Sequence, residues 1–226
     1  RAALICDLQG MREEASFFGR MATASYDERE QGHTGNYFSY LWGPIGVNRL
    51  GEEAVSAFLR EQRWYYDLAR AHDGSFPYQG GAGMSGGEHK YGKWDCTGAF
   101  VLANTFHRKT LFITGRGTDK RNRLTGADLE ATIEAGRGYD SWSKGAEHYG
   151  ARRTAELMRD LKSWSPAVRS RAAAALAESG DVPVLDLRGM LKGRNLDARY
   201  GACQAIAELG GRAAAALPEL RRCLPT

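Results

Sequence analysis

Apolar residues recur every three or four positions along much of the chain, which is the spacing of one face of an α-helix. In residues 51–71 the positions at this spacing carry mainly aliphatic and aromatic side chains: Val55, Phe58, Leu59, Gln62, Tyr65, Tyr66 and Ala69. In residues 94–107 they are smaller: Ala99, Leu102, Ala103 and Phe106. The pattern predicts two amphipathic helices, joined by a glycine-rich connection of about 20 residues.

A repeat follows near the C-terminus. The segment LKSWSPAVRSRAAAALAESG (161–180) aligns without gaps on LKGRNLDARYGACQAIAELG (191–210). In each copy Ser165 or Asn195 stands where a helix N-cap belongs, and Gly180 or Gly210 stands where the helix must end. A second helix is predicted after each copy, in residues 182–192 and 213–224, and residues 147–163 are expected to supply the helix before them. Alanine-rich faces allow such helices to stack closely.

These copies resemble HEAT-type repeats, and the resemblance includes Arg169 and Arg199 at equivalent positions. It implies that the two arginines bond to neighbouring repeats rather than to a ligand. Only two full copies are visible, so we expect the stack to need the domain before it for stability.

Four segments of the N-terminal part are rich in glycine and aromatic residues: GHTGNYFSYLWGPIGVNRLG (32–51), DGSFPYQGG (73–81), YGKWDCTGAF (91–100) and LFITGRG (111–117). They look like the turn motifs of the α/α toroids of terpene cyclases and protein prenyltransferases. With the HEAT-like units after them, they resemble a bacterial domain family of unknown function with a toroid-like core. The resemblance covers roughly residues 30–117 and implies a ring of helical hairpins, or part of one.

The chain departs from the characterised toroid enzymes. It has no DxDD acid, no Cys-Gly-Glu-Gln thioester sequence and no Cys-His-Gly pair, and Asp95 and Cys96 are adjacent instead of forming Asp-x-Cys. None of those chemistries can therefore be carried over.

The sequence predicts an all-α fold, in which helical hairpins of an α/α toroid-like domain precede a short HEAT-like helical stack. We expect the toroid-like domain in residues 1–117 and a connecting segment with a short helix in residues 118–146. The stack is expected in residues 147–226.

Composition excludes several classes of protein. The chain has 226 residues, 42% of them hydrophobic, which suits a folded protein with a core. Its formal charge is +4, without a run of five or more like charges or a motif that reads a nucleic-acid groove, so no nucleic-acid partner is expected. No window approaches the ~18 apolar residues of a membrane span, so we expect a soluble chain without a membrane partner. The sequence starts at Arg1 inside a helix-like segment, so the native N-terminus is expected to be missing, and localisation stays open.

No cofactor is expected either. The chain has no GxxxxGK[ST] loop and no strand before its glycines, which argues against a nucleotide cradle. Its four cysteines are scattered without a CxxC pair, which argues against a zinc ribbon.

Polar residues that could meet at the mouth of the toroid form the candidate catalytic site: His33, Asp73 and Asp95. A histidine beside a carboxylate can act as a general base. A weaker alternative is a metal site made by Cys96 with His33, and His89 belongs to the same glycine-rich region. Each residue also has a structural interpretation, since Asp73 can form an Asx turn and Asp95 can cap the next helix.

Aromatic residues of the same region could line a pocket: Tyr37, Trp42, Phe76, Tyr91 and Trp94. Core packing is the competing interpretation of such a density of rings.

Two functions remain open at the level of sequence. The first is a binding module that offers a groove to a protein or peptide partner through the helical stack. The alternative is an enzyme, hydrolase, lyase or cyclase-like, with its polar site at the mouth of the toroid.

Overall fold

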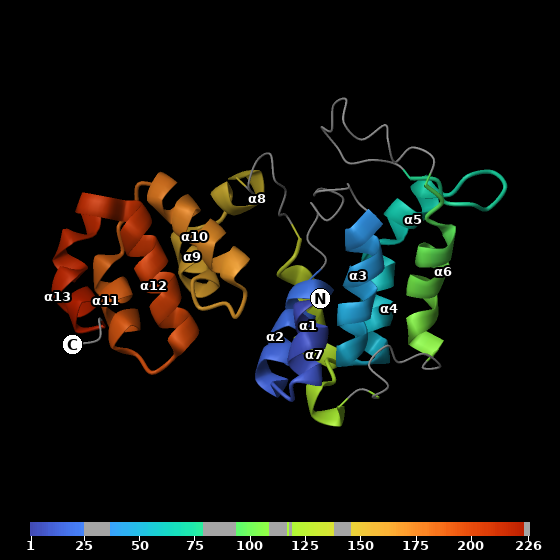
Figure 1. Ribbon diagram of the computed structural model, residues 1–226. Helices are drawn as coiled ribbons and strands as arrows, with labels where there is room; N and C mark the ends of the chain where they lie inside the picture. Colours follow the sequence, from blue (N-terminus) through green and yellow to red (C-terminus); the bar gives the residue numbers. More distant parts are fainter. Residues whose placement is uncertain (25–36, 79–93, 109–116, 118, 138–145, 224–226) are drawn as a thin grey trace. The chain divides into compact units, whose positions relative to one another are not determined.

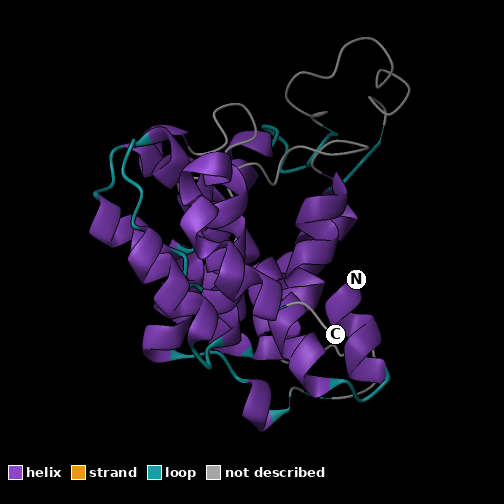
Figure 2. Cartoon of the chain, turned by 90° about the vertical axis from the view of Figure 1, so that its left-hand side faces the viewer, coloured by secondary structure: helices purple, strands orange, loops and turns teal. Residues whose placement is uncertain are grey.

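The computed structural model describes residues 1–24, 37–78, 94–108, 117, 119–137 and 146–223, and these residues are mostly helical (Figures 1 and 2). Within these ranges there is no β-strand, and the extended pairing consists of one isolated antiparallel bridge between Pro77 and Asp95. The predicted all-α fold is confirmed. No helix in this part of the chain is both long and apolar enough to cross a membrane.

The chain divides into two compact units, Arg1–Arg137 and Gly138–Thr226. The α-helices of the first unit are α1 (Ala2–Leu8), α2 (Arg12–Thr23), α3 (Tyr37–Val47), α4 (Glu52–Glu61), α5 (Arg63–Ala69), α6 (Thr97–Thr105) and α7 (Gly126–Glu134). Short 3₁₀ turns cover Asn48–Leu50, Phe106–Arg108 and Lys120–Asn122.

Aliphatic side chains from helices α1, α3, α4 and α7 form the first core of this unit. Its buried members include Ile45, Val47, Leu50, Val55, Phe58, Phe106, Leu129 and Ile133. A buried ion pair ties the end of α1 to this core, because Arg49 Nε lies 3.3 Å from Asp7 Oδ2 and the Arg49 side chain is only 4% exposed. Breaking such a pair would leave a buried charge unpaired.

Aromatic rings from α3, α5 and α6 form a second core. Its buried members are Tyr40, Tyr65, Tyr66, Ala69, Tyr78, Cys96 and Phe100. Tyr40 stacks on Tyr65 with 3.7 Å between ring centroids, and the Tyr66 hydroxyl donates to the Tyr40 carbonyl at 3.2 Å. The hydroxyl of a buried tyrosine thus keeps a hydrogen bond inside the core.

The single helix predicted for residues 51–71 is wrong in one respect, because it is broken at Gln62. The backbone of Gln62 leaves the helical region (φ −96°, ψ 5°) and separates α4 from α5. The two halves serve different cores: Val55 and Phe58 of α4 lie in the first, whereas Tyr65 and Tyr66 of α5 lie in the second. A straight helix would keep one apolar face, so a change of direction is needed to reach both cores.

The short helix expected in the connecting segment exists as α7. It packs against α2 and α4 and contributes Leu129 and Ile133 to the first core. Leu124, just before it, is also held to this unit, since its N–H donates to the Leu50 carbonyl at 3.0 Å.

The helices of the second unit are α8 (Ala146–Gly150), α9 (Thr154–Asp160), α10 (Pro166–Glu178), α11 (Val184–Lys192), α12 (Leu196–Leu209) and α13 (Leu217–Arg222). A 3₁₀ segment, Gly210–Ala216, precedes α13. Helix α10 lies beside α12, and α11 packs against both α12 and α13 (Figure 1). The helices therefore form two layers, with α10 and α12 in one and α11 and α13 in the other.

The boundaries of the repeated helix follow the sequence prediction. Ser165 and Asn195 occupy the N-cap positions of α10 and α12, and the Asn195 side chain accepts a hydrogen bond from the Ala198 N–H at 2.9 Å. Gly180 (φ 81°) and Gly210 (φ 56°), which follow their helices, both have a positive φ. Glycine is suited to this conformation because it has no Cβ.

Arg169 joins the two copies, as expected. Its Nη1 donates to the Ser163 carbonyl at 2.6 Å, to the Trp164 carbonyl at 3.1 Å and to Asp197 Oδ1 at 2.8 Å. Asp197 lies in the first turn of α12, so one buried guanidinium holds the turn before α10 to the next copy.

Two other helix predictions are wrong. Residues 147–163 form two helices, because the backbone is extended at Arg153 (ψ 154°) and the Glu156 carboxylate accepts from the Arg153 N–H at 2.9 Å where α9 begins. Residues 213–224 do not form one helix either, since Ala213 is non-helical and the chain runs through a 3₁₀ segment before α13. Pro218 then lies at the start of α13, where a missing N–H is tolerated.

Two further contacts join neighbouring parts of this unit. Glu219 Oε1 accepts from Arg188 Nη2 at 2.8 Å and lies 3.3 Å from Lys192 Nζ, which joins α13 to α11. On α12, Gly201 lies so close to the preceding copy that a Cβ there would be 1.9 Å from the Leu161 carbonyl oxygen.

Candidate functional site

The two glycine-flanked segments that carry the predicted site residues pair with each other. The Tyr78 N–H donates to the Trp94 carbonyl at 3.0 Å, and the Cys96 N–H donates to the Phe76 carbonyl at 2.8 Å. The Thr97 hydroxyl also accepts from the Phe76 N–H at 2.8 Å. Residues 73–78 and 94–97 thus meet where α5 ends and α6 begins.

The carboxylates of Asp73 and Asp95 both hold turns. Asp73 Oδ1 accepts from the N–H and hydroxyl of Ser75 at 2.9 and 2.7 Å, and Asp95 Oδ1 accepts from the Thr97 N–H at 2.9 Å. The first is an Asx turn, and the second satisfies an N–H at the start of α6.

Electrostatics keeps both of these carboxylates ionised. Hydrogen bonds from Ser75 lower the pKa of Asp73. Hydrogen bonds from Thr97 lower the pKa of Asp95, and the nearby charge of Asp73 opposes that shift. A general acid needs a raised pKa, so both groups are suited to accepting hydrogen bonds rather than to donating a proton.

Cys96 is buried beneath this turn, with 1% of its surface exposed. Burial raises the pKa of its thiol to about 11, and the charge of Asp95 adds to the shift. Because the thiolate is both the nucleophile and the metal ligand, this environment activates Cys96 for neither role.

The histidines proposed for this site, His33 and His89, lie outside the described residues. The catalytic interpretation of His33 with Asp73 and Asp95, and the metal interpretation of Cys96 with His33, therefore stay predictions. Within the described ranges no group of three or more His, Cys, Asp or Glu side chains is placed to hold a metal ion.

Of the aromatic residues proposed to line a pocket, Phe76 and Trp94 border the second core, whereas Trp42 lies at the first. Phe76 packs against the second core, with its ring 5.5 Å from that of Phe100, whereas Trp42 packs against the first core. Trp94 is 40% exposed, with its ring 6.2 Å from the buried ring of Tyr78. Tyr91 and the side chain of Tyr37 lie outside the described residues.

A groove that the sequence analysis did not predict lies between α4 and α7. Its volume is about 770 Å³, and the buried side chains of Ala57, Leu129 and Ile133 line it. Charged residues of both helices complete its lining: Glu53, Arg60, Glu61, Glu130, Glu134 and Arg137. The groove thus combines an apolar surface with four carboxylates and two guanidinium groups.

Arginine-centred ion pairs bridge the two helices beside this groove. Arg137 Nη2 lies 2.7 Å from Glu61 Oε1 and its Nε lies 3.2 Å from Glu61 Oε2, while Nη1 reaches Glu134 at 3.2 Å. These carboxylates raise the pKa of Arg137, with Glu61 the larger cause. Glu53 and Glu130 are exposed and contribute further negative charge.

The sequence feature that indicates this groove is a pair of small residues on α7. Ala127 and Ala131 are spaced i, i+4 on exposed positions of α7, and they line the groove opposite α4. Alanine at these positions leaves space that a larger side chain would fill. The sequence alone did not show that α7 lies against α4.

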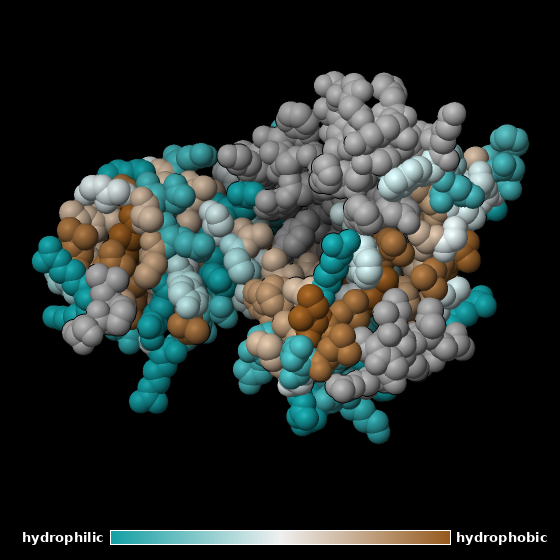
Figure 3. Space-filling view, in the orientation of Figure 1, coloured by the Kyte–Doolittle hydropathy of each residue, from teal (hydrophilic) through white to brown (hydrophobic). Residues whose placement is uncertain are grey.

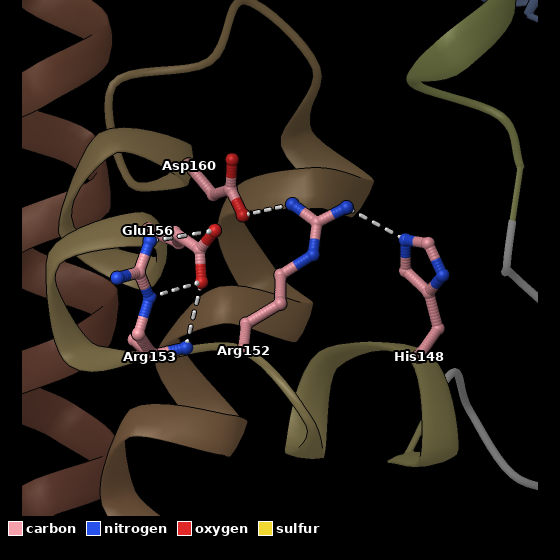
Figure 4. Close-up of polar contacts among 5 residues, drawn as sticks. All are labelled: His148, Arg152, Arg153, Glu156 and Asp160. Carbon is pink, nitrogen blue, oxygen red and sulfur yellow. Dashed lines mark hydrogen bonds and ion pairs between the residues drawn. The ribbon is translucent and has the colours of Figure 1, made fainter.

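A second polar cluster joins α8 to α9 in the other unit (Figure 4). Arg152 lies between His148 and Asp160: its Nη2 is 2.7 Å from His148 Nε2, and its Nη1 forms an ion pair with Asp160. The guanidinium also lies over the Tyr149 ring at 4.9 Å from the centroid. Arginine only donates, so His148 Nε2 is the acceptor in this contact.

This arrangement is suited to holding α8 and α9 together. Arg152 contacts both His148 of α8 and Asp160 of α9, so its guanidinium links the two helices.

Comparison with known proteins gives one match. No curated protein and no solved structure shows significant similarity to this sequence. The family model of a domain of unknown function, DUF6288, matches residues 1–115, about half of the 226 residues. The matched part contains helices α1 to α6 and most of both cores. The chain therefore belongs to the DUF6288 family.

Proposed function

We propose that this chain is a helical interaction module that binds a protein or peptide partner. In this proposal residues 1–117 form a toroid-like arrangement of helical hairpins and residues 147–226 a HEAT-like stack, joined by residues 118–146. The observation that best supports this function is the groove between α4 and α7, whose lining combines apolar and charged side chains.

The chemistry of the groove specifies the occupant. Ala57, Leu129 and Ile133 favour apolar side chains, and the excess of glutamate over arginine around them favours cationic ones. An amphipathic helix with leucine-like residues on one face and lysine or arginine beside them satisfies both requirements. Small residues on α7, Ala127 and Ala131, leave room for its side chains.

A labelled amphipathic helix of leucine and lysine tests the proposal, with a helix of leucine and glutamate as its control. We expect saturable binding of the basic peptide to the full chain by fluorescence anisotropy, and no binding of the acidic one. Added salt should weaken binding, because exposed charges are screened.

The variant Ala131→Trp fills the groove from an exposed position, so it should fold and yet bind at least ~10-fold more weakly, roughly 1.4 kcal/mol. The matched control Ala214→Trp places the same ring at an exposed alanine of the other unit. Equal binding by both variants, or no binding of the basic peptide to the unaltered chain, would refute the proposed function.

A further inference from the structure

The two repeat copies differ in which positions they bury. An offset of 30 residues maps α10 onto α12, and most buried positions coincide: Val168 with Ala198, Ala172 with Ala202, Ala175 with Ala205, and Leu176 with Ile206. Two positions are buried in α10 but not in α12, and two others, Gly201 and Leu209, are buried only in α12. Arg169 and Ala173 are buried in α10, whereas Arg199 and Cys203 are only half-buried in α12.

The side of α10 that carries Arg169 faces the next copy. Arg169 Nη1 is 2.8 Å from Asp197 Oδ1 in the first turn of α12, and its guanidinium lies 5.9 Å from the centroid of the Tyr200 ring. By the symmetry of the repeat, the side of α12 that carries Arg199 and Cys203 is the side on which a further copy would lie.

Apolar residues extend this side of α12 into a stripe. Leu196 (53% exposed), Tyr200 (54% exposed), Cys203 and Ala207 are spaced i, i+4, i+7 and i+11, which is one face of a helix. Tyr200 lies at the edge of this stripe nearest the preceding copy, beside Arg169. In the second layer Leu217, the first residue of α13, is 45% exposed. Figure 3 shows apolar atoms reaching the surface over α11, α12 and α13.

We propose that this surface, the terminal face (Leu196, Arg199, Tyr200, Cys203, Ala207 and Leu217), docks a helical hairpin of a partner protein. The hairpin has an acidic residue in the first turn of its first helix and small residues along the side that faces Arg199. The inference rests on the proposed role as an interaction module, but it uses a surface separate from the groove between α4 and α7.

These two requirements on the partner, an acidic residue and a side of small residues, are taken from the contact between α10 and α12. Helix α12 presents to the preceding copy one carboxylate, Asp197, and small residues such as Gly201 and Ala202. A partner built alike would pair its carboxylate with Arg199 and pack its small residues over Cys203 and Ala207. It would continue an interface that the chain already uses once.

A second copy of this chain does not meet these requirements with the same helix. Asp197 is already paired with Arg169, and Gly201 is already packed against the Leu161 carbonyl. The carboxylate and the small stripe of α12 are therefore occupied within each copy.

The probe is a labelled peptide with the sequence of residues 193–222, in which the Asp197 side of the helix is free. We expect it to bind the full chain saturably in reducing buffer, measured by fluorescence anisotropy. Arg199→Asp in the chain should weaken binding at least tenfold, and a peptide carrying Asp197→Arg should restore binding to that variant. Arg194→Asp is the control, because Arg194 is exposed and lies just before α12.

Three outcomes would overturn the inference: no saturable binding of the peptide, equal binding by the Arg199→Asp and Arg194→Asp chains, or no rescue by the charge-reversed peptide. Sedimentation that shows a dimer dispersed by Tyr200→Ala would assign the terminal face to a second copy and also overturn it. Ala131→Trp should leave peptide binding unchanged, so failure here is distinguishable from failure of the groove.

Discussion

The two units of this chain are stabilised in different ways. The first unit buries large rings and branched aliphatic side chains from helices far apart in the sequence, and Tyr40, Phe58, Phe100 and Phe106 are almost completely inaccessible. The second unit packs alanines and a glycine between neighbouring copies and fixes them with charged contacts such as Arg169 to Asp197. Stability in the first unit should depend on side-chain volume, and in the second on close backbone approach.

This difference also separates what each unit can offer a partner. In the first unit the groove is a space left between two packed helices by small residues. In the second, the terminal face repeats a contact that the unit already makes internally. The partner of the first unit is inferred from the charge and apolar surface of the groove. The partner of the second unit is inferred from the contact that α10 already makes with α12.

The largest effect is expected when volume is removed from the aromatic core. Phe100→Ala should destabilise the first unit by about 3–5 kcal/mol, because it leaves a cavity among Tyr40, Tyr65 and Tyr66. Denaturant unfolding measures the loss, and hydrogen exchange should show that α10 and α12 stay protected. The neighbouring change Val101→Ala, at a side chain that is 52% exposed, is the control and should cost little. Equal losses for both variants would contradict a core held by side-chain volume.

An intermediate effect is expected when one methyl group is added between the repeats. Alanine for glycine within a helix usually stabilises, by roughly 0.5–1 kcal/mol. Gly201→Ala should instead destabilise by about 1–3 kcal/mol, since its Cβ would overlap the Leu161 carbonyl and force the helices apart. Gly189→Ala in α11 is the matched control, because nothing lies within 4 Å of its Cβ, and it should stabilise. Thermal unfolding that moves both variants in one direction would rule out close approach as the cause.

The smallest effect is expected in the dependence of stability on pH. Glu219 is buried beside Arg188 and Lys192, and the Arg188 hydrogen bond is the main cause that lowers its pKa to about 2. A carboxyl whose pKa is lowered on folding stabilises fully above its unfolded value, near 4.5, and loses this contribution as the pH falls towards 2. The stability of Glu219→Gln should therefore vary less than that of the unaltered chain over this range.

Urea unfolding at several pH values measures this slope. Glu208→Gln, at an exposed glutamate of α12, should retain the slope of the unaltered chain. A Glu219→Gln chain with an unchanged slope would show that the ion pairs of α13 contribute nothing to the acid sensitivity.

Local signals predicted much of the second unit. The ends of α10 and α12 depend on residues next to them, Asn195, Gly180 and Gly210, so an alignment of two copies was enough to place them. The break at Gln62 was not predictable in this way. It arises because α4 and α5 pack into different cores, which depends on contacts with residues distant in the sequence.

The candidate site shows the same limit of prediction from sequence. The capping interpretations of Asp73 and Asp95 could be stated from the sequence because their hydrogen-bond donors lie two residues away. The burial of Cys96 and the groove beside Ala131 required knowledge of which helices touch. Short-range chemistry was predictable, whereas cavities and desolvation were not.

The hydrogen bond from the Tyr78 N–H to the Trp94 carbonyl ties the segment after α5 to the segment before α6. Both of its atoms belong to the main chain, so it does not depend on which side chains stand at these two positions. Substitutions at Trp94, and any at Tyr78 except proline, should therefore leave α5 and α6 anchored to each other.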